Sequence, residues 1–297
     1  MRILRVLPTL GLCLLAAVQY LWISPQLLRL SADYAEESSF NARSQYRESP
    51  TEAWINSSLT ARRVDTTLIA SASHSIIEGD MHWSNDAGEV QYENTGIYGV
   101  DRYTRMNLPE YGDTVRSGPF LFPPHIQRKT FSYWDPVYLG SRVATFERLD
   151  IIGGLKVYVF LFKATAIDET AGYSQLRDVP ERYHVHSDGI GHLWVEPTSG
   201  ALVDFEDQGV SYFVENKTGK RVGDVYKWSS RYSPKTKEFK IKQALMQRRN
   251  ILALELWLPI GLLLAGLFWY VDAFKLVSSK AHSVNNKMQP VISGGKP

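Results

Sequence analysis

The sequence is poor in cysteine and in net charge. A chain of 297 residues contains a single cysteine, Cys13. One thiol excludes an intramolecular disulfide framework and any zinc or iron–sulfur site built from cysteines. The 33 basic side chains are nearly balanced by 31 acidic ones, which excludes a strongly basic nucleic-acid binder. A hydrophobic share of 44% likewise excludes an intrinsically disordered chain.

Catalytic signatures are also missing. The sequence has no Gly-rich phosphate loop, dinucleotide fingerprint, Gly-x-Ser-x-Gly elbow or paired-histidine metalloprotease helix. The nearest approach to a metal site is His184 and His186, which would share one face of a strand, with His192 and Glu196 following. A turn at 188–190 decides whether His192 joins them, and we interpret all three as exposed strand histidines. We therefore expect no catalytic residue, no metal site and no cofactor, and we predict that the protein is not an enzyme.

Two long apolar runs lie near the ends of the chain. No charged side chain occurs from Val6 to Leu28, and at about 1.5 Å per residue this run exceeds the roughly 20 residues that cross a bilayer core. The second run, from Ile251 to Val271, contains Glu255 as its only charge and has tryptophan and tyrosine near its ends, as interfacial belts do. A cleaved signal peptide is the alternative for the first run, although Ala16-Ala17 is a weak cleavage site. We predict two transmembrane helices.

These runs define the predicted domains. The predicted order is a short cytoplasmic N-terminus (1–5), a transmembrane helix (6–28), an extracytoplasmic β-rich domain (29–250), a second transmembrane helix (251–271) and a cytoplasmic basic tail (272–297). Arg2, Arg5 and the lysines of the tail favour cytoplasmic termini, whereas the basic stretch 235–249 opposes this orientation. Because long loops cross largely regardless of charge, we predict a double-pass protein of the plasma membrane with its main domain outside.

The region between the runs reads as antiparallel β-sheet. β-branched and aromatic residues recur between turn signals such as Gly153-Gly154 and Asp188-Gly189. The predicted strands are 64–70, 90–92, 96–103, 143–146, 155–162, 183–186, 192–195, 201–205 and 210–215. Helices are expected at the margins, over 26–45 and from about 235 into the second run. The predicted fold class is mainly antiparallel β, flanked by two transmembrane α-helices.

One strand and one proline-containing segment suggest an apolar interior. The strand 155–162 is apolar on both faces, so both faces must be covered, either as the centre of a core or as the wall of a ligand cavity. Pro123 and Pro124 donate no backbone hydrogen bonds, which predicts an extended segment beside this strand. The predicted wall of the cavity consists of Phe120, Phe122, Pro123, Phe146, Val157 and Phe160.

Several motifs of this region resemble known families. The motifs Arg63-Val64-Asp65, Phe122-Pro123-Pro124, 129–136 and 194–200 are similar to the actinobacterial PorA-like family of double-anchored envelope proteins. More distantly, Phe122-Pro123-Pro124, Arg142, Phe146-Glu147, Gly154 and Val157-Tyr158-x-Phe160 resemble the class B scavenger receptors. Those receptors have two membrane anchors and an apolar tunnel that carries lipid, so the resemblance implies a lipid-binding cavity or groove. Their ectodomain disulfides have no counterpart here, because the only cysteine lies in the first apolar run.

We compare three functional hypotheses. The leading one is a non-catalytic, membrane-anchored module of the cell envelope that binds and transfers a membrane lipid or a lipid-linked sugar. The basic stretch 235–249 would lie near the bilayer surface, where it favours anionic lipid head groups. One alternative is a structural or assembly subunit with other membrane proteins as partners. The other is an oligomeric pore. No nucleic-acid partner is expected.

Overall fold

The computed structural model describes residues 3–135, 140–174 and 177–286. The chain divides into two units, which are the residues up to Leu28 together with those from Arg249 onward, and the domain Arg29–Arg248. Within the described ranges, two helical stretches are long and apolar enough to cross a membrane, Leu7–Leu28 and Pro234–Asp272. Both predicted spans thus have helical counterparts.

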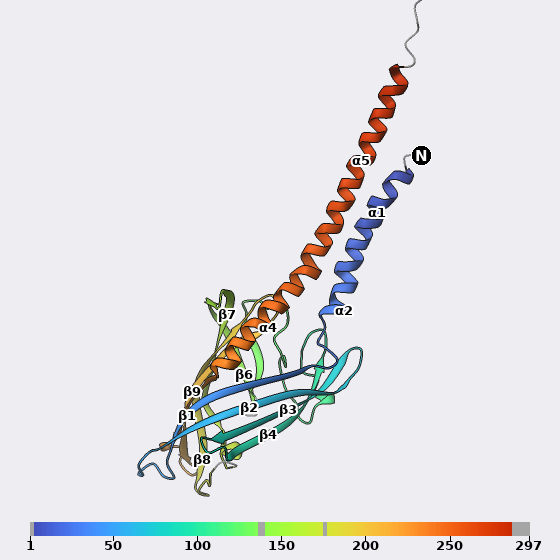
Figure 1. Ribbon diagram of the computed structural model, residues 1–297. Coiled ribbons are helices and arrows are strands. Elements are labelled where there is room, and N and C mark those ends of the chain that lie inside the picture. The colour runs from blue at the N-terminus through green and yellow to red at the C-terminus, as the bar shows by residue number, and fades with distance from the viewer. Residues whose placement is uncertain (1–2, 136–139, 175–176, 287–297) are drawn as a thin grey trace, which may run out of the picture. The chain divides into compact units, whose positions relative to one another are not determined.

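The helices of the first unit lie side by side (Figure 1). The Thr9 hydroxyl donates to the carbonyl of Gly266 at 3.2 Å, and the Ser24 hydroxyl donates to the carbonyl of Leu254 at 3.0 Å. Hydrogen bonds of this kind link neighbouring transmembrane helices, because polar groups inside a bilayer have no water to bind. The helical segments of this unit are α1 (Ile3–Val18), the π-helical turn η1 (Gln19–Ile23), α2 (Ser24–Leu28), the π-helical turn η3 (Ala253–Trp257) and α5 (Leu258–Asn286). Helix α4 (Pro234–Leu252) belongs to the domain up to Arg248.

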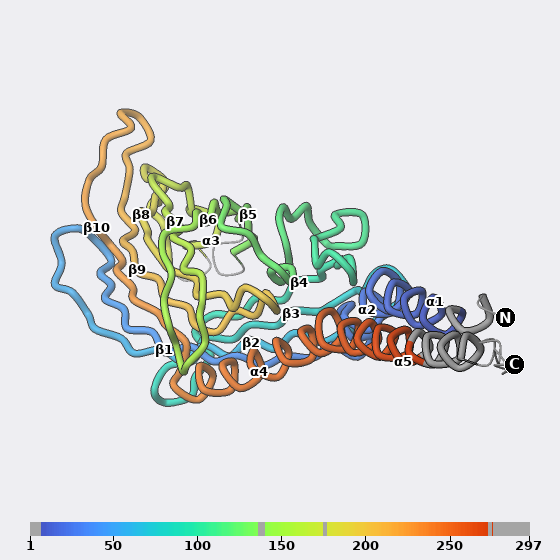
Figure 2. The backbone as a smooth tube through the Cα atoms, turned by 90° about the horizontal axis from the view of Figure 1, so that it is seen from above, coloured from blue at the N-terminus to red at the C-terminus, as the bar shows by residue number. Residues whose placement is uncertain are grey.

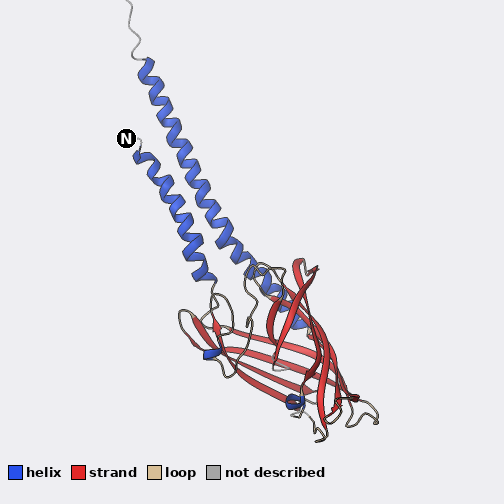
Figure 3. Cartoon of the chain, turned by 180° about the vertical axis from the view of Figure 1, so that it is seen from behind, coloured by secondary structure: helices blue, strands red, loops and turns tan. Residues whose placement is uncertain are grey.

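Among the described residues, ten strands form one antiparallel sheet in the order β4-β3-β2-β1-β10-β9-β8-β7-β6-β5. The first and last strands are neighbours at its centre, and the sheet is strongly curved, as Figures 1 and 2 show. The strands are β1 (Ala35–Tyr46), β2 (Ile55–Ala70), β3 (His74–Asn85), β4 (Val90–Asp101), β5 (Phe131–Asp135), β6 (Gly140–Ile152), β7 (Leu155–Asp168), β8 (Tyr183–Val195), β9 (Leu202–Glu215) and β10 (Arg221–Tyr232). Two short helices, η2 (Pro109–Tyr111) and α3 (Thr170–Tyr173), complete the domain. Figure 3 shows the predominance of strands, which confirms the predicted fold class.

The helix expected over 26–45 is wrong beyond its first turn, because β1 occupies its second half. β1 pairs along its length with β2 and also with β10. Its small residues Ser38, Ala42 and Ser44 are buried at alternate positions. This period of two is set by the neighbouring strands, and it is hard to see in a polar sequence without long apolar side chains. The helix expected from 235 is confirmed by α4.

Some predicted turns are confirmed and one is wrong. Gly153 and Gly154 have φ angles of 55° and 79°, as a two-residue hairpin with a primed turn requires, and they join β6 to β7. In contrast, Asp188-Gly189 lies inside β8, where Gly189 pairs with both Ala164 and Gly209. The predicted strands 183–186 and 192–195 are therefore one strand. Gly189 is here part of a continuous strand and does not form a turn.

The two edges of the sheet are joined by residues 102–130, which we call the connecting segment. On the β4 side, the Leu108 amide donates to the Gly99 carbonyl at 2.8 Å. On the β5 side, the Ser117 and Ser132 hydroxyl oxygens are 2.9 Å apart. The guanidinium of Arg116 lies 4.0 Å from the Tyr98 ring of β4 and 5.3 Å from the Trp134 ring of β5. The connecting segment thus covers both open edges.

The doubly apolar strand is covered on both faces, as predicted. Phe160 and Phe162 of β7 point to the inner face, where they belong to a cluster with Phe122 of the connecting segment. Val157 and Val159 point to the outer face and pack in a second cluster with Ala244 of α4. The alternation follows from the two-residue period of a strand. We call these faces inner and outer below.

Helix α4 is fixed to the sheet by buried polar contacts as well as by Ala244. The Lys240 ammonium forms an ion pair with Glu36 of β1, and the side chain of Lys240 is only 4% exposed. The Thr236 hydroxyl accepts from the Ser39 amide at 2.9 Å. Because an unpaired charge is costly in such a place, the Lys240–Glu36 pair holds α4 in one position on the sheet.

Candidate functional site

The inner face carries an aromatic cluster. The rings of Phe122 and Phe160 are stacked with centroids 5.8 Å apart, and Phe131 meets both edge-on at 6.0 and 5.7 Å. Such offset and edge-on pairs are the favoured geometries of buried rings. The buried members are Phe122, Ile126, Ala144, Phe160, Phe162, Leu193 and Val195, and Phe131, Tyr133, Phe146, Tyr158, Leu202 and Phe205 pack against them.

Two members of this cluster come from the connecting segment rather than from the sheet. Phe122 and Ile126 are 7% and 4% exposed. Their backbone is held at a few points, since the Ile126 amide donates to the Pro197 carbonyl at 3.0 Å and Arg105 donates to the Phe122 carbonyl at 3.0 Å. The inner face of the sheet is thus filled in part by a segment that belongs to no strand.

The structure separates the six predicted cavity residues. Phe122, Phe146 and Phe160 meet in the aromatic cluster, and the Phe146 and Phe160 ring centroids are 6.1 Å apart. Phe120 lies instead in a cluster with Tyr98, their ring centroids 5.1 Å apart.

Two further predicted residues are placed differently. Pro123 presents its backbone to Gly200, where a Cβ would lie 2.5 Å from the Pro123 carbonyl oxygen. Val157 lies on the outer face, so the expectation that it shares an interior with Phe160 is wrong. Residues three apart on a strand point to opposite faces. Whether any of the six residues binds a ligand stays a prediction.

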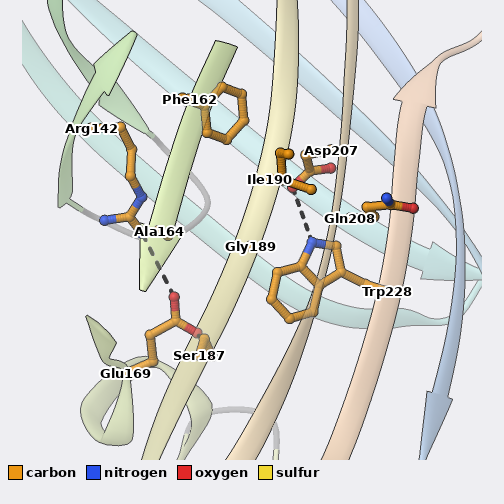
Figure 4. A pocket seen from close by; sticks show the side chains of 10 residues that line it. All are labelled: Arg142, Phe162, Ala164, Glu169, Ser187, Gly189, Ile190, Asp207, Gln208 and Trp228. Carbon is orange, nitrogen blue, oxygen red and sulfur yellow. Dashed lines mark hydrogen bonds and ion pairs between the residues drawn. The ribbon is translucent and has the colours of Figure 1, made fainter. Parts of the chain in front are cut away.

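A hollow of about 240 Å³, part of which is open to solvent, lies beside the aromatic cluster on the inner face (Figure 4). Its enclosed part has room for about one water molecule. Phe162 and Trp228 form apolar walls, and Ala164 and Gly189 form part of the floor. The polar lining residues include Arg142, Glu169, Ser187 and Asp207. The hollow is therefore lined by both apolar and charged side chains.

The charged groups of the hollow form a polar cluster from separate elements. Arg142 of β6 pairs with Glu169, which precedes α3, at 3.6 Å and with Asp135 of β5 at 3.9 Å. The side chain of Arg142 is only 4% exposed. Opposite them, the Trp228 indole N–H of β10 donates to Asp207 of β9 at 3.0 Å. Hydrogen-bonded partners of this kind are needed wherever charges are buried.

The pKa of Glu169 is shifted upward in the hollow. Burial raises its pKa to about 7, against the opposing effects of the Ser187 hydroxyl and Arg142. The Ser187 oxygen lies 2.5 Å from the Glu169 carboxyl and 2.8 Å from the Ser211 hydroxyl. The Ser187 hydroxyl donates to the Glu169 carboxyl, which by itself favours the ionised form. Burial outweighs this bond and favours the neutral form of the carboxyl.

Sequence reasoning missed Arg142, Glu169 and Asp207 as site residues. Arg142 occurs only within the second family resemblance, and the two acids stand in stretches with no motif. Their elements are far apart in the chain and are brought together by the order of strands in the sheet. The sequence around each of these residues does not indicate which strands are neighbours in the sheet.

The histidines of β8 do not form a shared site. Val185 is fully buried on the inner face, so His184 and His186 on either side of it point outward. His192 is 3.5 Å from Glu147 and 3.3 Å from Glu206. Among the residues that the structure describes, no group of three or more His, Cys, Asp or Glu is arranged to hold a metal ion.

Fold and helices define the class of the protein. It is a membrane protein with a β-rich domain and two candidate membrane-spanning helices. Residues 9–273 match the family model described as Porin PorA, and the chain belongs to this family. No curated protein matches the chain.

Solved structures show only distant likenesses. One is DynF from the dynemicin biosynthesis pathway of Micromonospora chersina, with 7% identity, 70% of this chain and 85% of that chain covered, and a TM-score of 0.25. Another is an exported protein with a YmcC-like fold from Bacteroides fragilis, with 7% identity, 67% and 96% covered, and a TM-score of 0.23. Neither carries a functional argument. The resemblance to class B scavenger receptors stays a prediction.

Proposed function

We propose that the domain binds the apolar part of a membrane lipid or lipid-linked sugar on its inner face and assists the movement of that lipid in the cell envelope, without catalysis. The observation that carries the proposal is the aromatic cluster, which is completed by side chains of the connecting segment and adjoins a hollow lined by charges. An apolar region beside a polar one is what an amphipathic ligand needs. The chain supplies the tether, because candidate membrane spans precede and follow the domain.

In this proposal an acyl chain takes the place of Phe122 and Ile126. Each buried methylene of a lipid contributes about 0.8 kcal/mol, so a few methylenes offset the contacts that one of these side chains loses. The connecting segment is not part of the sheet, so the exchange breaks no strand pairing, although it must release bonds such as that from the Ile126 amide to the Pro197 carbonyl. A ligand that binds the opened form then shifts the population toward it.

The access route would lie along β5, where the connecting segment meets the sheet edge. The Ser117 hydroxyl oxygen lies 2.9 Å from that of Ser132 and 2.5 Å from that of Ser141, beside the contacts of Phe122 with Phe131 and of Arg116 with Trp134. The hydroxyl contacts contribute little to stability, so opening depends on the exchange of the Phe122 contacts for those of the lipid.

The experiment links the connecting segment to the β5 edge with a disulfide bond. A Ser117→Cys/Ser132→Cys pair in a Cys13→Ser background should form a disulfide across the β5 edge. Lipids that co-purify with the full-length protein are identified by mass spectrometry. Uptake of the same lipids is then measured with and without reductant. We expect oxidation to reduce lipid uptake and reductant to restore it.

A matched control uses the Ser39→Cys/Ser233→Cys pair, whose hydroxyl oxygens are 2.6 Å apart and which joins β1 to the residue before α4. Its oxidation should leave lipid uptake unchanged. If no lipid is enriched on the unlocked protein, the proposed function is wrong. If lipid binds equally well with the β5 edge locked, the access route is wrong.

The description of the family as porin favours an oligomeric pore as a second candidate. The sheet itself is an unsuitable wall for one, because a membrane barrel needs an apolar outer face. Instead, Glu37, Asn41 and Arg43 of β1 and Arg62 of β2 are exposed on the outer face. A pore would thus have to be built by helices of several copies. Absence of single-channel conductance from the purified protein in planar bilayers would exclude it.

A further inference from the structure

The hairpin between β2 and β3 is tied to the residues that directly follow the first candidate span. That span ends at Leu28, so the backbone of Leu30 lies within about 8 Å of it along the chain. The Leu30 amide donates to the Arg102 carbonyl at 2.7 Å, and the Arg102 guanidinium donates to the Leu30 carbonyl at 2.8 Å. The Arg102 amide donates in turn to the Ser73 carbonyl of the hairpin at 2.8 Å. We call residues 68–74 the β2–β3 tip. Its place close to the end of the span thus follows from chain connectivity and hydrogen bonds within the domain.

The β2–β3 tip and its flanks carry no charged side chain. No Asp, Glu, Lys or Arg occurs from Thr66 to Ile77. Antiparallel pairing places three other hairpins at the opposite end of the sheet. Their connections are charged and contain Arg47, Glu48 and Glu52 (β1 to β2), Asp86 and Glu89 (β3 to β4), and Lys217 and Lys220 (β9 to β10). Hairpin connections in water are normally polar, so the β2–β3 tip suits a less polar surrounding.

A β-bulge presents two apolar side chains of the tip together. The register of β2 and β3 shifts between Thr67 and Ile69, which leaves Leu68 without a partner residue in β3. Ile69 pairs with Ile76. Leu68 and Ile69 are 52% and 62% exposed. Bulges re-aim side chains in this way, and here the result is an adjacent apolar pair that the domain leaves uncovered.

The tip and the neighbouring loop are held in fixed conformations. The Ser71 hydroxyl accepts from the His74 amide at 3.0 Å and so closes the turn. In the loop after β4, the Asp101 carboxylate accepts from the Tyr103 amide at 2.9 Å. Tyr103 directly follows Arg102, which is bonded to the tip, and its side chain is 38% exposed. An amphipathic tyrosine ring therefore accompanies the apolar pair, as in the aromatic belts of membrane proteins.

We propose that the β2–β3 tip docks into the interfacial layer of the bilayer that the chain itself spans, with Leu68 and Ile69 among the lipid head groups. The occupant is lipid because the tip is tied to the end of a span and apolar side chains gain free energy on leaving water for this layer. The Arg29 guanidinium, which donates to the Ala72 carbonyl at 3.3 Å, adds a cation that favours phosphate groups. This docking is independent of lipid binding on the inner face.

The experiment compares the surroundings of a fluorophore at the two ends of β2. Ala72→Cys in the tip and Ala53→Cys before β2 are both at exposed positions, and each is made in a Cys13→Ser background. The full-length proteins are labelled with the environment-sensitive fluorophore NBD and reconstituted into vesicles of phosphatidylcholine and phosphatidylglycerol. A nitroxide on the phosphatidylcholine, placed near the head group or near the chain end, acts as the quencher.

We expect the label at position 72 to emit at shorter wavelength and to be quenched more by the nitroxide near the head group, as a depth of about 5 to 10 Å requires. The label at position 53 should show neither effect. Equal responses at the two positions overturn the proposal. A shift to shorter wavelength at position 72 without nitroxide quenching also overturns it, because a protein surface and not lipid then covers the tip.

Variants test whether the apolar pair causes the docking. Leu68→Ser combined with Ile69→Ser should reduce nitroxide quenching at position 72 to the level seen at position 53. Ile55→Ser is the matched control, because Ile55 is 50% exposed at the other end of β2, and it should leave quenching unchanged. Thermal melting in detergent identifies variants that fail to fold, and the comparison of positions 72 and 53 stands without them. Unchanged quenching in the folded double variant overturns the proposal.

Discussion

Glu169→Gln should make the stability of the protein less dependent on pH. In the folded domain burial raises the pKa of Glu169 from its ordinary value of 4.5 to about 7. The folded state therefore holds this proton more tightly than the unfolded state does. The stabilising contribution of Glu169 is complete below about pH 4.5 and is lost as the pH rises through 7.

The magnitude follows from the same shift. Between pH 4.5 and 7 the unfolded state binds about one proton fewer, so the free energy of unfolding falls by about 1.4 kcal/mol per pH unit. Over the whole range this amounts to roughly 3 kcal/mol. Glutamine does not titrate, and its amide oxygen can accept from the Ser187 hydroxyl as the carboxyl does. The variant should thus equal the native protein at pH 4 and exceed it by roughly 3 kcal/mol at pH 8.

The assay is thermal melting of the full-length protein in detergent at a series of pH values. For a domain of this size, roughly 3 kcal/mol corresponds to about 6 to 12 °C in Tm. Exposed Glu110→Gln of η2 serves as the control, because it makes the same chemical change outside the hollow. Other titrating groups are common to both proteins, so they cancel in the difference. A difference between Glu169→Gln and the native protein that stays constant from pH 4 to 8 would refute the reasoning.

Three further predictions concern packing and the docking of α4. Phe122→Ala should lower the free energy of unfolding by about 3 kcal/mol, and added lipid should restore part of it; a lipid-independent loss contradicts the exchange of Phe122 for an acyl chain. Val157→Trp should lower the free energy of unfolding by about 1 to 3 kcal/mol through overpacking of the outer face, while lipid binding per folded molecule stays unchanged. A loss of lipid binding at an unchanged Tm would instead place Val157 in the ligand site. Lys240→Met should lower the free energy of unfolding in urea by about 3 to 5 kcal/mol, because Glu36 is left buried without its cation. Adding Glu36→Gln should recover most of this loss, and a double variant as unstable as the single one contradicts the pairing.

Local patterns predicted those parts of the fold that depend on neighbours in the sequence. The two apolar runs predicted helices because length and hydropathy suffice for a spanning helix. Gly153-Gly154 predicted a hairpin because its positive φ angles are a property of the two residues themselves. The apolar side chains at both odd and even positions of 155–162 predicted a strand covered on both faces, and both clusters are present.

The predicted cavity wall shows where such reasoning stops. Phe122 and Phe160 were correctly expected to meet, because the prolines keep the segment extended and out of the strand pairing while its phenylalanines need an apolar partner. Phe120 joins another cluster, since the path of the connecting segment depends on its bonds to β4 and not on its own residues.

The sequence by itself determined which segments are apolar, that most of the domain is extended, and the tight turn at Gly153-Gly154. Tertiary structure decided that β1 is a strand between β2 and β10, and that Arg142, Glu169 and Asp207 share one hollow. The physical reason is the separation along the chain over which each kind of interaction acts. A side-chain pattern reports the environment of each face within a few residues, whereas strand order and register are set by pairing energies between segments that are far apart in the chain. Buried charges come together only once that pairing is made.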